Sequence, residues 1–199
     1  MKFRLQLEVP GGATRVLLHA CCAPCSSAIV ECLMERGITP VIFYSNSNIF
    51  PEEEYGHRRN ECIRYARKWG IDIVDDVYDH GDWRGCVHGL ENEPERGARC
   101  LRCFEYRLER AARYAAENGF SVLATTLASS RWKDLEQVNA AGQAACEKVE
   151  GVQWWAQNWR KGGLQERRGE IIREEQFYNQ RYCGCEFSLR PLGESGEKP

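Results

Sequence analysis

The sequence predicts an α/β fold, in which a parallel β-sheet is covered by helices on both faces. Short apolar runs alternate along the 199 residues with longer segments of helical periodicity, which is the pattern of strand–helix–strand units. The runs at 16–18 and 41–44 are apolar at every position, as is typical of strands buried on both faces. A single α/β domain over 1–199 is expected, with flexible ends at 1–13 and 190–199.

Glycines and changes of periodicity divide the chain into elements. Strands are expected at 15–20, 41–44, 71–74, 122–126 and 152–155. Helices are expected at 26–36, 51–69, 100–118, 134–147 and 170–178. Gly37 and Gly70 stand where the first two helices should end. The polar residues 75–99 should form a loop with one short helix, and 158–168 should form a basic loop.

Composition and charge exclude several classes of protein. The formal net charge of −2 and the pI of about 6.1 argue against an overall basic protein but allow a local nucleic-acid surface. No apolar run approaches the ~20 residues of a membrane span, so no membrane contact is expected. Residues 1–10 carry scattered charges instead of the apolar core of a signal peptide. The cytoplasm is therefore the expected compartment.

Eleven cysteines are many for a chain expected in a reducing compartment, and an odd number cannot all pair. Clustered cysteines in such a compartment indicate a metal site or a redox cycle. Seven of them form three groups: Cys21, Cys22 and Cys25; Cys100 and Cys103; Cys183 and Cys185. Packing is the simpler interpretation for the single cysteines at 32, 62 and 146, and the role of Cys86 stays open.

The first group stands where the first expected strand meets a helix. Ligands of open α/β sheets bind beyond the carboxyl ends of strands, and unpaired N–H groups at a helix start favour thiolates. The alternative is that Cys21, Cys22 and Cys25 are small buried apolar residues. Two adjacent cysteines cannot both face one core from a regular element, however, so a binding role is favoured.

The second group opens the expected helix at 100–118, with Cys100 and Cys103 one turn apart. If the strands at 15–20 and 122–126 are neighbours, this pair can face Cys21 and Cys22 across the crevice. Four thiolates suit a [4Fe–4S] cluster or zinc. Structural zinc normally uses pairs spaced by two to four residues, so the adjacent pair favours the cluster.

The third group is the pair Cys183 and Cys185, separated by one glycine. Such a pair can close a small, easily reduced disulfide, and it can thereby store and release two electrons. Two further metal ligands, or an inert turn, are the alternatives.

Polar loops follow several strands and would line the same crevice. Asn46, Asn48, Lys133 and Asp134 are candidates for positioning a small polyhydroxylated group, with turn formation and helix capping as the alternative. His19 is expected to make a structural hydrogen bond, and no partner can be named for His80 or His88.

The basic loop supplies the candidates for RNA phosphates. Arg160 and Lys161, with Arg167 and Arg168, could contact phosphates while the tryptophans at 154, 155 and 159 stack on bases. The alternative is a solvated charge run with the tryptophans in the core.

Six stretches together resemble the QueH type of epoxyqueuosine reductase, in the same order from about residue 15 to 189. They are 18–25 (LHACCAPC), 43–49 (FYSNSNI), 99–103 (RCLRC), 125–127 (TTL), 158–163 (NWRKGG) and 178–185 (YNQRYCGC). The resemblance implies a Rossmann-like fold of the nucleotide-hydrolase superfamily. It also implies reduction of the epoxide of epoxyqueuosine to queuosine at the tRNA wobble position, the last step of that modification.

The resemblance further implies a [4Fe–4S] cluster on Cys21, Cys22, Cys100 and Cys103 and a redox-active pair at 183 and 185. An additional iron ion is associated with the family, and Cys25 is the position expected to reach it. tRNA and an unidentified electron donor are the implied partners. Ser47, where proline is expected, and the loop at 128–131 depart from the family pattern. A tRNA-thiolating enzyme of the same fold and a zinc module that binds RNA are the rival interpretations.

Overall fold

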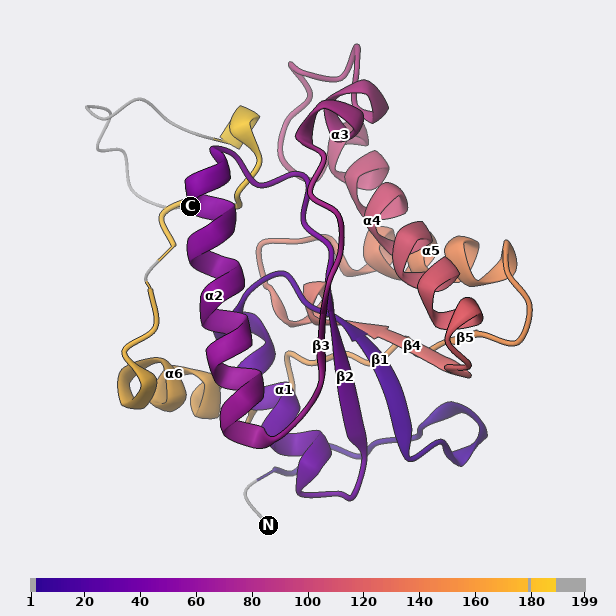
Figure 1. Ribbon diagram of the computed structural model, residues 1–199, viewed down its shortest axis with the longest axis vertical. Coiled ribbons are helices and arrows are strands. Elements are labelled where there is room, and N and C mark those ends of the chain that lie inside the picture. The colour runs from indigo at the N-terminus through magenta and orange to yellow at the C-terminus, as the bar shows by residue number, and fades with distance from the viewer. Residues whose placement is uncertain (1–2, 179, 189–199) are drawn as a thin grey trace.

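The computed structural model describes residues 3–178 and 180–188 and contains one five-stranded parallel sheet (Figure 1). The strands run in the order β3-β2-β1-β4-β5. Their bounds are β1 Arg15–His19, β2 Thr39–Tyr44, β3 Ile73–Asp75, β4 Val122–Thr125 and β5 Gln153–Trp154. All four pairings are parallel, which confirms the predicted fold class.

Helices cover both faces of the sheet (Figure 1). The bounds of the helices are α1 Ala23–Met34, α2 Glu52–Trp69, α3 His80–Cys86, α4 Ala98–Glu117, α5 Leu135–Glu147 and α6 Leu164–Glu175. Three short 3₁₀ helices are η1 Pro10–Gly12, η2 Thr126–Ser129 and η3 Glu186–Ser188. α1 packs against α2 and α6 on one face, and α4 packs against α5 and α3 on the other. None of the helices described is long and apolar enough to cross a membrane.

The strand order places a topological switch point between β1 and β4. The chain builds outward from β1 through β2 to β3, then returns to place β4 and β5 on the other side of β1. Connections leaving β1 and β4 therefore go to opposite faces of the sheet. In open α/β sheets, ligands bind at this switch point, beyond the carboxyl ends of the strands. Cys21 lies just beyond the end of β1, so the first cysteine group stands at that point.

The central strands fix the position of this switch point because they are completely buried. Val16, Leu17 and Leu18 of β1 have no exposed surface, and Leu123 of β4 beside them has none. The register pairs Leu17 with Leu123. Because strands buried on both faces cannot slip without exposing apolar side chains, their carboxyl ends hold fixed positions.

Two helices, α1 and α6, begin three or more residues earlier than the sequence predicts. α1 begins at Ala23 instead of residue 26, because Pro24 fits the first helical turn, where no N–H partner is needed. Cys25 therefore lies inside that turn. α6 begins at Leu164 instead of residue 170, after Gly163 in the left-handed region at φ 89°. The predicted basic loop thus ends at 163, and Arg167 and Arg168 are helical.

Part of the expected flexible end at 1–13 packs against the rest of the domain. Phe3 and Leu5 are buried in the main core, and the Arg4 amide donates to the Gly162 carbonyl at 3.0 Å. A Cβ on Gly162 would lie 2.7 Å from the Leu5 nitrogen, so only glycine permits this contact. The expected flexible end at 190–199 lies outside the described residues.

Candidate active site

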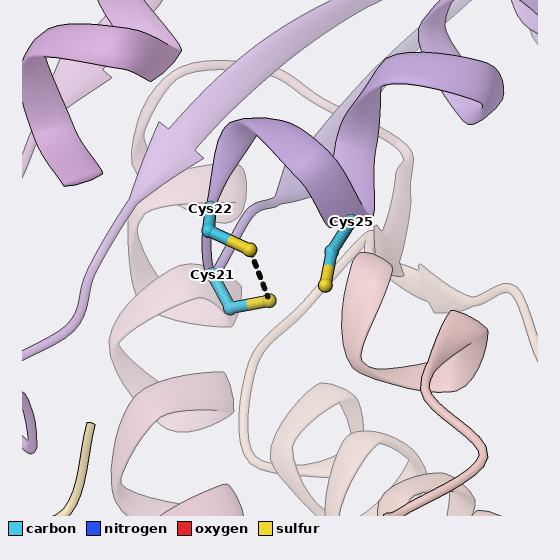
Figure 2. A group of neighbouring side chains, drawn as sticks. All are labelled: Cys21, Cys22 and Cys25. Atoms are coloured by element: carbon cyan, nitrogen blue, oxygen red, sulfur yellow. Dashed lines mark hydrogen bonds between the residues drawn. The ribbon is translucent and has the colours of Figure 1, made fainter. Parts of the chain in front are cut away.

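Three thiols meet where β1 connects to α1 (Figure 2). The sulfur atoms of Cys21, Cys22 and Cys25 all lie within 4.8 Å of one another, and those of Cys21 and Cys22 are 3.9 Å apart. Cys21 comes from the turn, Cys22 precedes the first turn of α1, and Cys25 lies within it. A group of thiols at this spacing can bind a soft metal ion or part of an iron–sulfur cluster.

The pKa values of the three thiols are shifted in opposite directions. Hydrogen bonds from Cys22 and Cys25 hold the pKa of Cys21 well below its ordinary value, and Arg107 adds to this effect against the cost of burial. The hydrogen bond to Cys21 raises the pKa of Cys22, and it raises that of Cys25 to about 12. Of the three thiols, Cys21 is therefore the one that loses its proton most readily.

Thr126, directly after β4, is hydrogen-bonded to Cys21, just beyond the end of β1. Its hydroxyl accepts a hydrogen bond from the Cys21 amide at 3.2 Å and donates to the Cys21 sulfur at 3.5 Å. Nearby, the Nδ1 of buried His19 lies 2.8 Å from the Thr125 hydroxyl, and its Nε2 lies 3.2 Å from the Ser45 carbonyl. Burial lowers the pKa of His19 to about 3, so the predicted structural role of this neutral histidine is confirmed.

Cysteines of the second and third groups lie in or beside a small depression at the start of α4. Cys103 is buried beside Trp83 and Cys185. Cys100 lines the depression itself. The other residues lining it are Glu95, Arg96, Arg99, Phe104, Trp132, Lys133, Asp134, Cys183, Cys185 and Ser188. The second and third cysteine groups, which are far apart in sequence, therefore share one site.

The two thiols of the Cys-Gly-Cys pair have different surroundings. Residue Cys183 is exposed and Cys185 is buried, and both are free thiols. Although the residue as a whole is exposed, loss of water around its sulfur atom would by itself raise the pKa of Cys183. The ammonium group of Lys133, with Nζ 3.1 Å from Sγ, instead lowers that pKa below the ordinary value. Burial raises the pKa of Cys185 to about 12, and neighbouring Cys103 adds to that effect. Cys183 is therefore the more nucleophilic thiol of the pair.

Arg58 holds the segment that carries this pair. Its guanidinium donates to the Cys183 carbonyl at 3.0 Å and to the Tyr182 carbonyl at 3.2 Å. The Phe50 amide donates to the Gly184 carbonyl at 2.9 Å. Gly184 has φ 110°, and a Cβ there would lie 2.9 Å from Cγ1 of Ile49. The glycine between the cysteines is thus required by both backbone conformation and space.

Buried cations without carboxylate partners surround the cysteines. Arg107 donates to the Ser45 carbonyl at 3.2 Å and to the side-chain oxygen of Asn46. Within the described part of the chain, Arg99 donates only to backbone carbonyls, at residues 90, 91 and 93. Arg99 and Arg107 are 4% and 2% exposed. No carboxylate among the described residues lies within ion-pair distance of either arginine or of Lys133. Buried uncompensated charge is costly, so this site suits an anionic occupant such as a thiolate-bound cluster.

Arg107 and Lys133 each interact with both Cys21 of the first cysteine group and Cys183 of the third. Arg107 lowers the pKa of Cys21 and that of Cys183. Partial burial would lower the pKa of Lys133, but Cys183 most strongly, and also Cys21, raise it. Cys100 and Cys103 do not belong to the close group of Cys21, Cys22 and Cys25 in the described part of the chain. Each thiolate of a [4Fe–4S] centre binds a different iron, so its ligands need not touch.

The comparisons with known proteins decide the family. A model of the family described as epoxyqueuosine reductase QueH matches residues 16–191. The chain belongs to the QueH family of epoxyqueuosine reductases. It is accordingly an oxidoreductase.

Curated relatives with that family name cover most of the chain. The protein of Histophilus somni is 50% identical over 187 residues, which is 94% of this chain and 77% of the relative. That of Acinetobacter baylyi is 48% identical over 95% of this chain and 87% of its own length. The chain is also similar to a solved structure described as a predicted subunit of a tRNA methyltransferase from Methanocaldococcus jannaschii. The TM-score is 0.53 at 14% identity, over 83% of this chain and 93% of the other, which shows the fold alone.

Most of the predicted substrate residues of this QueH-family chain have structural partners. Asn46 donates to the Ala20 carbonyl at 2.9 Å and accepts from Arg107. Asp134 caps α5 by accepting from the amides of 136 and 137. Arg160 donates to the Lys133 carbonyl at 2.7 Å. By contrast, the side-chain oxygen of buried Asn48 has no hydrogen-bond partner among the described residues, so it remains available to a ligand.

The basic segment offers fewer free cations and aromatic rings than the sequence suggested. Arg167 pairs with Glu31, Glu170 and Glu174. Arg168 donates to the Pro24 carbonyl at 2.9 Å, and its NH2 lies 4.0 Å from the Cys25 sulfur. Trp155 and Trp159 are buried in the core, so for them the core alternative is correct. Lys161 is exposed and remains a candidate for a phosphate.

Sequence reasoning missed Arg107 and Arg58. Arg107 lies four residues after Cys103 on α4, so helical periodicity puts it on the same face as that cysteine. An arginine on a cysteine-bearing face was therefore a usable signal. Arg58 lies 125 residues from Cys183 in sequence, and no local pattern links the two residues.

Proposed function

We propose that this chain reduces the epoxide of epoxyqueuosine at the tRNA wobble position to queuosine. In this proposal Cys21, Cys22, Cys100 and Cys103 hold a [4Fe–4S] cluster, and Cys25 is the candidate contact to an additional iron ion. The observation that carries the proposal is that three thiols meet beyond the end of β1, while Arg107 and Lys133 interact with both this group and Cys183. When bound, the metal centre supplies single electrons and a Lewis acid for the epoxide oxygen.

The Cys-Gly-Cys pair can supply the electrons and protons that the reaction needs. Conversion of an epoxide to an alkene consumes two electrons and two protons and releases water. Oxidation of Cys183 and Cys185 to a disulfide releases two electrons. The same oxidation releases two protons, one from each thiol, and the Lys133 ammonium 3.1 Å from the Cys183 sulfur favours loss of the Cys183 proton. An external reductant then returns the disulfide to two thiols.

The location of each group supports this division of roles. Cys185 packs beside Cys103, so the pair adjoins a proposed cluster ligand. Cys183 and Lys133 line the depression together, where a flipped-out base can present its side group. All eleven cysteines are free thiols, as expected in a reducing compartment, and we place the reaction in the cytoplasm.

The test is anaerobic reduction of tRNA that carries epoxyqueuosine, followed by nucleoside analysis of the digested tRNA. Wild-type protein should produce queuosine over many turnovers with a chemical reductant. The Cys183→Ser variant should keep the visible absorption of the cluster but lose multiple turnover. Loss of that absorption in the variant would instead make Cys183 a ligand, and absence of queuosine with wild-type protein would refute the proposed activity.

A further inference from the structure

The loop at 130–134, which follows η2, has no regular structure, yet its backbone is held firmly. Arg96 donates from Nε to the Trp132 carbonyl at 3.0 Å and from NH2 to the Arg131 carbonyl at 3.3 Å. Arg160 donates to the Lys133 carbonyl at 2.7 Å. Three consecutive carbonyls are thus satisfied by two arginine side chains, which fixes the direction of the side chains between them.

Arg96 is itself anchored to the cysteine site. It adopts φ 68°, in the left-handed region that non-glycine residues seldom occupy. Its amide donates to the Cys100 sulfur at 3.3 Å, and its carbonyl accepts from the Gln137 side chain at 2.7 Å. Backbone strain of this kind persists where surrounding contacts enforce it. The loop is therefore positioned relative to Cys100.

This anchoring presents an aromatic ring at the edge of the depression. Trp132 lines the depression together with Lys133 and Cys183, yet it is 42% exposed. The Arg131 guanidinium lies 4.8 Å from the centre of the indole ring. An exposed tryptophan beside cations suits a ligand that combines a flat ring with negative charge. An unpaired nucleotide has both properties, since bases stack on aromatic rings and phosphates attract arginine.

We propose that Trp132, supported by Arg131, stacks on an unpaired base of the anticodon loop next to the nucleotide that enters the depression. This inference rests on the proposed function and names its RNA contact. The rigid loop lowers the conformational entropy lost on binding, because the ring is already oriented. Trp132 thereby orients the RNA, while Cys183 and Lys133 face the reacting group.

The experiment measures the affinity of the cluster-loaded protein for a fluorescein-labelled anticodon stem-loop RNA by anisotropy. Trp132→Ala should weaken binding by about 10- to 100-fold, which corresponds to the loss of one base–aromatic stack. Trp132→Phe should retain most of the affinity. Tyr178→Ala is the matched control, because that aromatic side chain is similarly exposed at 40% but does not line the depression.

A second series locates the stacked base. Loop nucleotides are replaced one at a time by abasic sites, and at one position wild-type protein and Trp132→Ala should bind equally well. Unchanged affinity of Trp132→Ala overturns the inference, as does an equal loss in Tyr178→Ala. A raised KM for the reductant with normal RNA affinity also overturns it, and would assign Trp132 to reductant docking.

The proposed function is judged separately. If wild-type protein forms queuosine but Trp132→Ala binds RNA normally, only the stacking inference fails. If wild-type protein forms no queuosine and does not bind the stem-loop RNA, both fail.

Discussion

The contact between Lys133 and Cys183 is the residue-scale feature on which the proposed redox chemistry depends. The lysine was expected from sequence only as a polar residue lining the crevice. The structure instead places its Nζ 3.1 Å from a thiol 50 residues away. No local pattern could predict this pairing, since it depends on how the segment after α6 returns over the start of α4.

Replacement of Lys133 by methionine should raise the pKa of the Cys183 thiol. The lysine cation favours the thiolate, so its loss moves thiolate formation to higher pH. At a pH below the new pKa, alkylation of Cys183 by iodoacetamide should slow about tenfold for every tenfold fall in the thiolate fraction, because the thiolate is the reactive form. Peptide mass spectrometry of the labelled protein measures this rate across a pH series.

Lys133→Arg serves as the control for that change, because it keeps the positive charge and should give a profile close to wild type. If the pH profile of Cys183 alkylation is the same in the methionine variant and the wild type, Lys133 does not lower the pKa of Cys183.

At the scale of single elements, the sequence predicted which segments are strands and helices better than where helices begin. The buried runs of β1 and β2 determine their own structure, because only a strand buries every successive side chain on two faces. Helix starts were missed at α1 and α6. Pro24 was interpreted as part of the turn although proline fits the first helical turn. Gly163 was interpreted as loop although it precedes α6 directly.

Element α4 carries the buried arginine that should help to retain an anionic cluster. Replacement of Arg107 by methionine removes that cation together with hydrogen bonds to Ser45 and Asn46. The metal-loaded protein should lose about 1–3 kcal/mol of unfolding free energy. The metal-stripped protein should lose less unfolding free energy, because without the cluster Arg107 faces less negative charge. Thermal unfolding of both forms, and the rate of iron loss to a chelator, measure the difference.

Arg113→Met is the control, because Arg113 lies on the same helix but is exposed, and its loss should leave both forms nearly unchanged. Equal destabilisation of the loaded and stripped forms by Arg107→Met would show that the arginine only supports the fold.

At the scale of the whole molecule, the site follows from strand order. The sequence predicted cysteines at strand and helix ends, and it predicted a shared crevice if the first and fourth strands were neighbours. That neighbour relation is confirmed, since His19 pairs with Thr125 in the register of β1 and β4. Side-chain direction could not be predicted in the same way. Asn46, Asp134 and Arg160 stand in the right loops but bond to the protein itself, because loop sequence does not specify where a side chain points.

The surface charge predicts how RNA binding responds to salt. Arg160, Arg167 and Arg168 are engaged within the protein, so Lys161 is the cation of that segment expected to bind a phosphate. Lys161→Ala should reduce the magnitude of the log–log slope of RNA affinity against salt by about 0.7–0.9, the value for one phosphate contact. An unchanged slope in binding titrations at several salt concentrations would exclude this contact.

The central claim is that cysteines from the ends of β1 and the start of α4 bind one inorganic cluster. The most direct measurement is the iron and acid-labile sulfide content of anaerobically purified protein, for the wild type and for Cys22→Ser and Cys100→Ser. Wild-type protein should be brown, with about four or five irons and about four sulfides per chain, and both variants should lose the cluster. Colourless wild-type protein that contains zinc, or a cluster retained in full by Cys100→Ser, would contradict it.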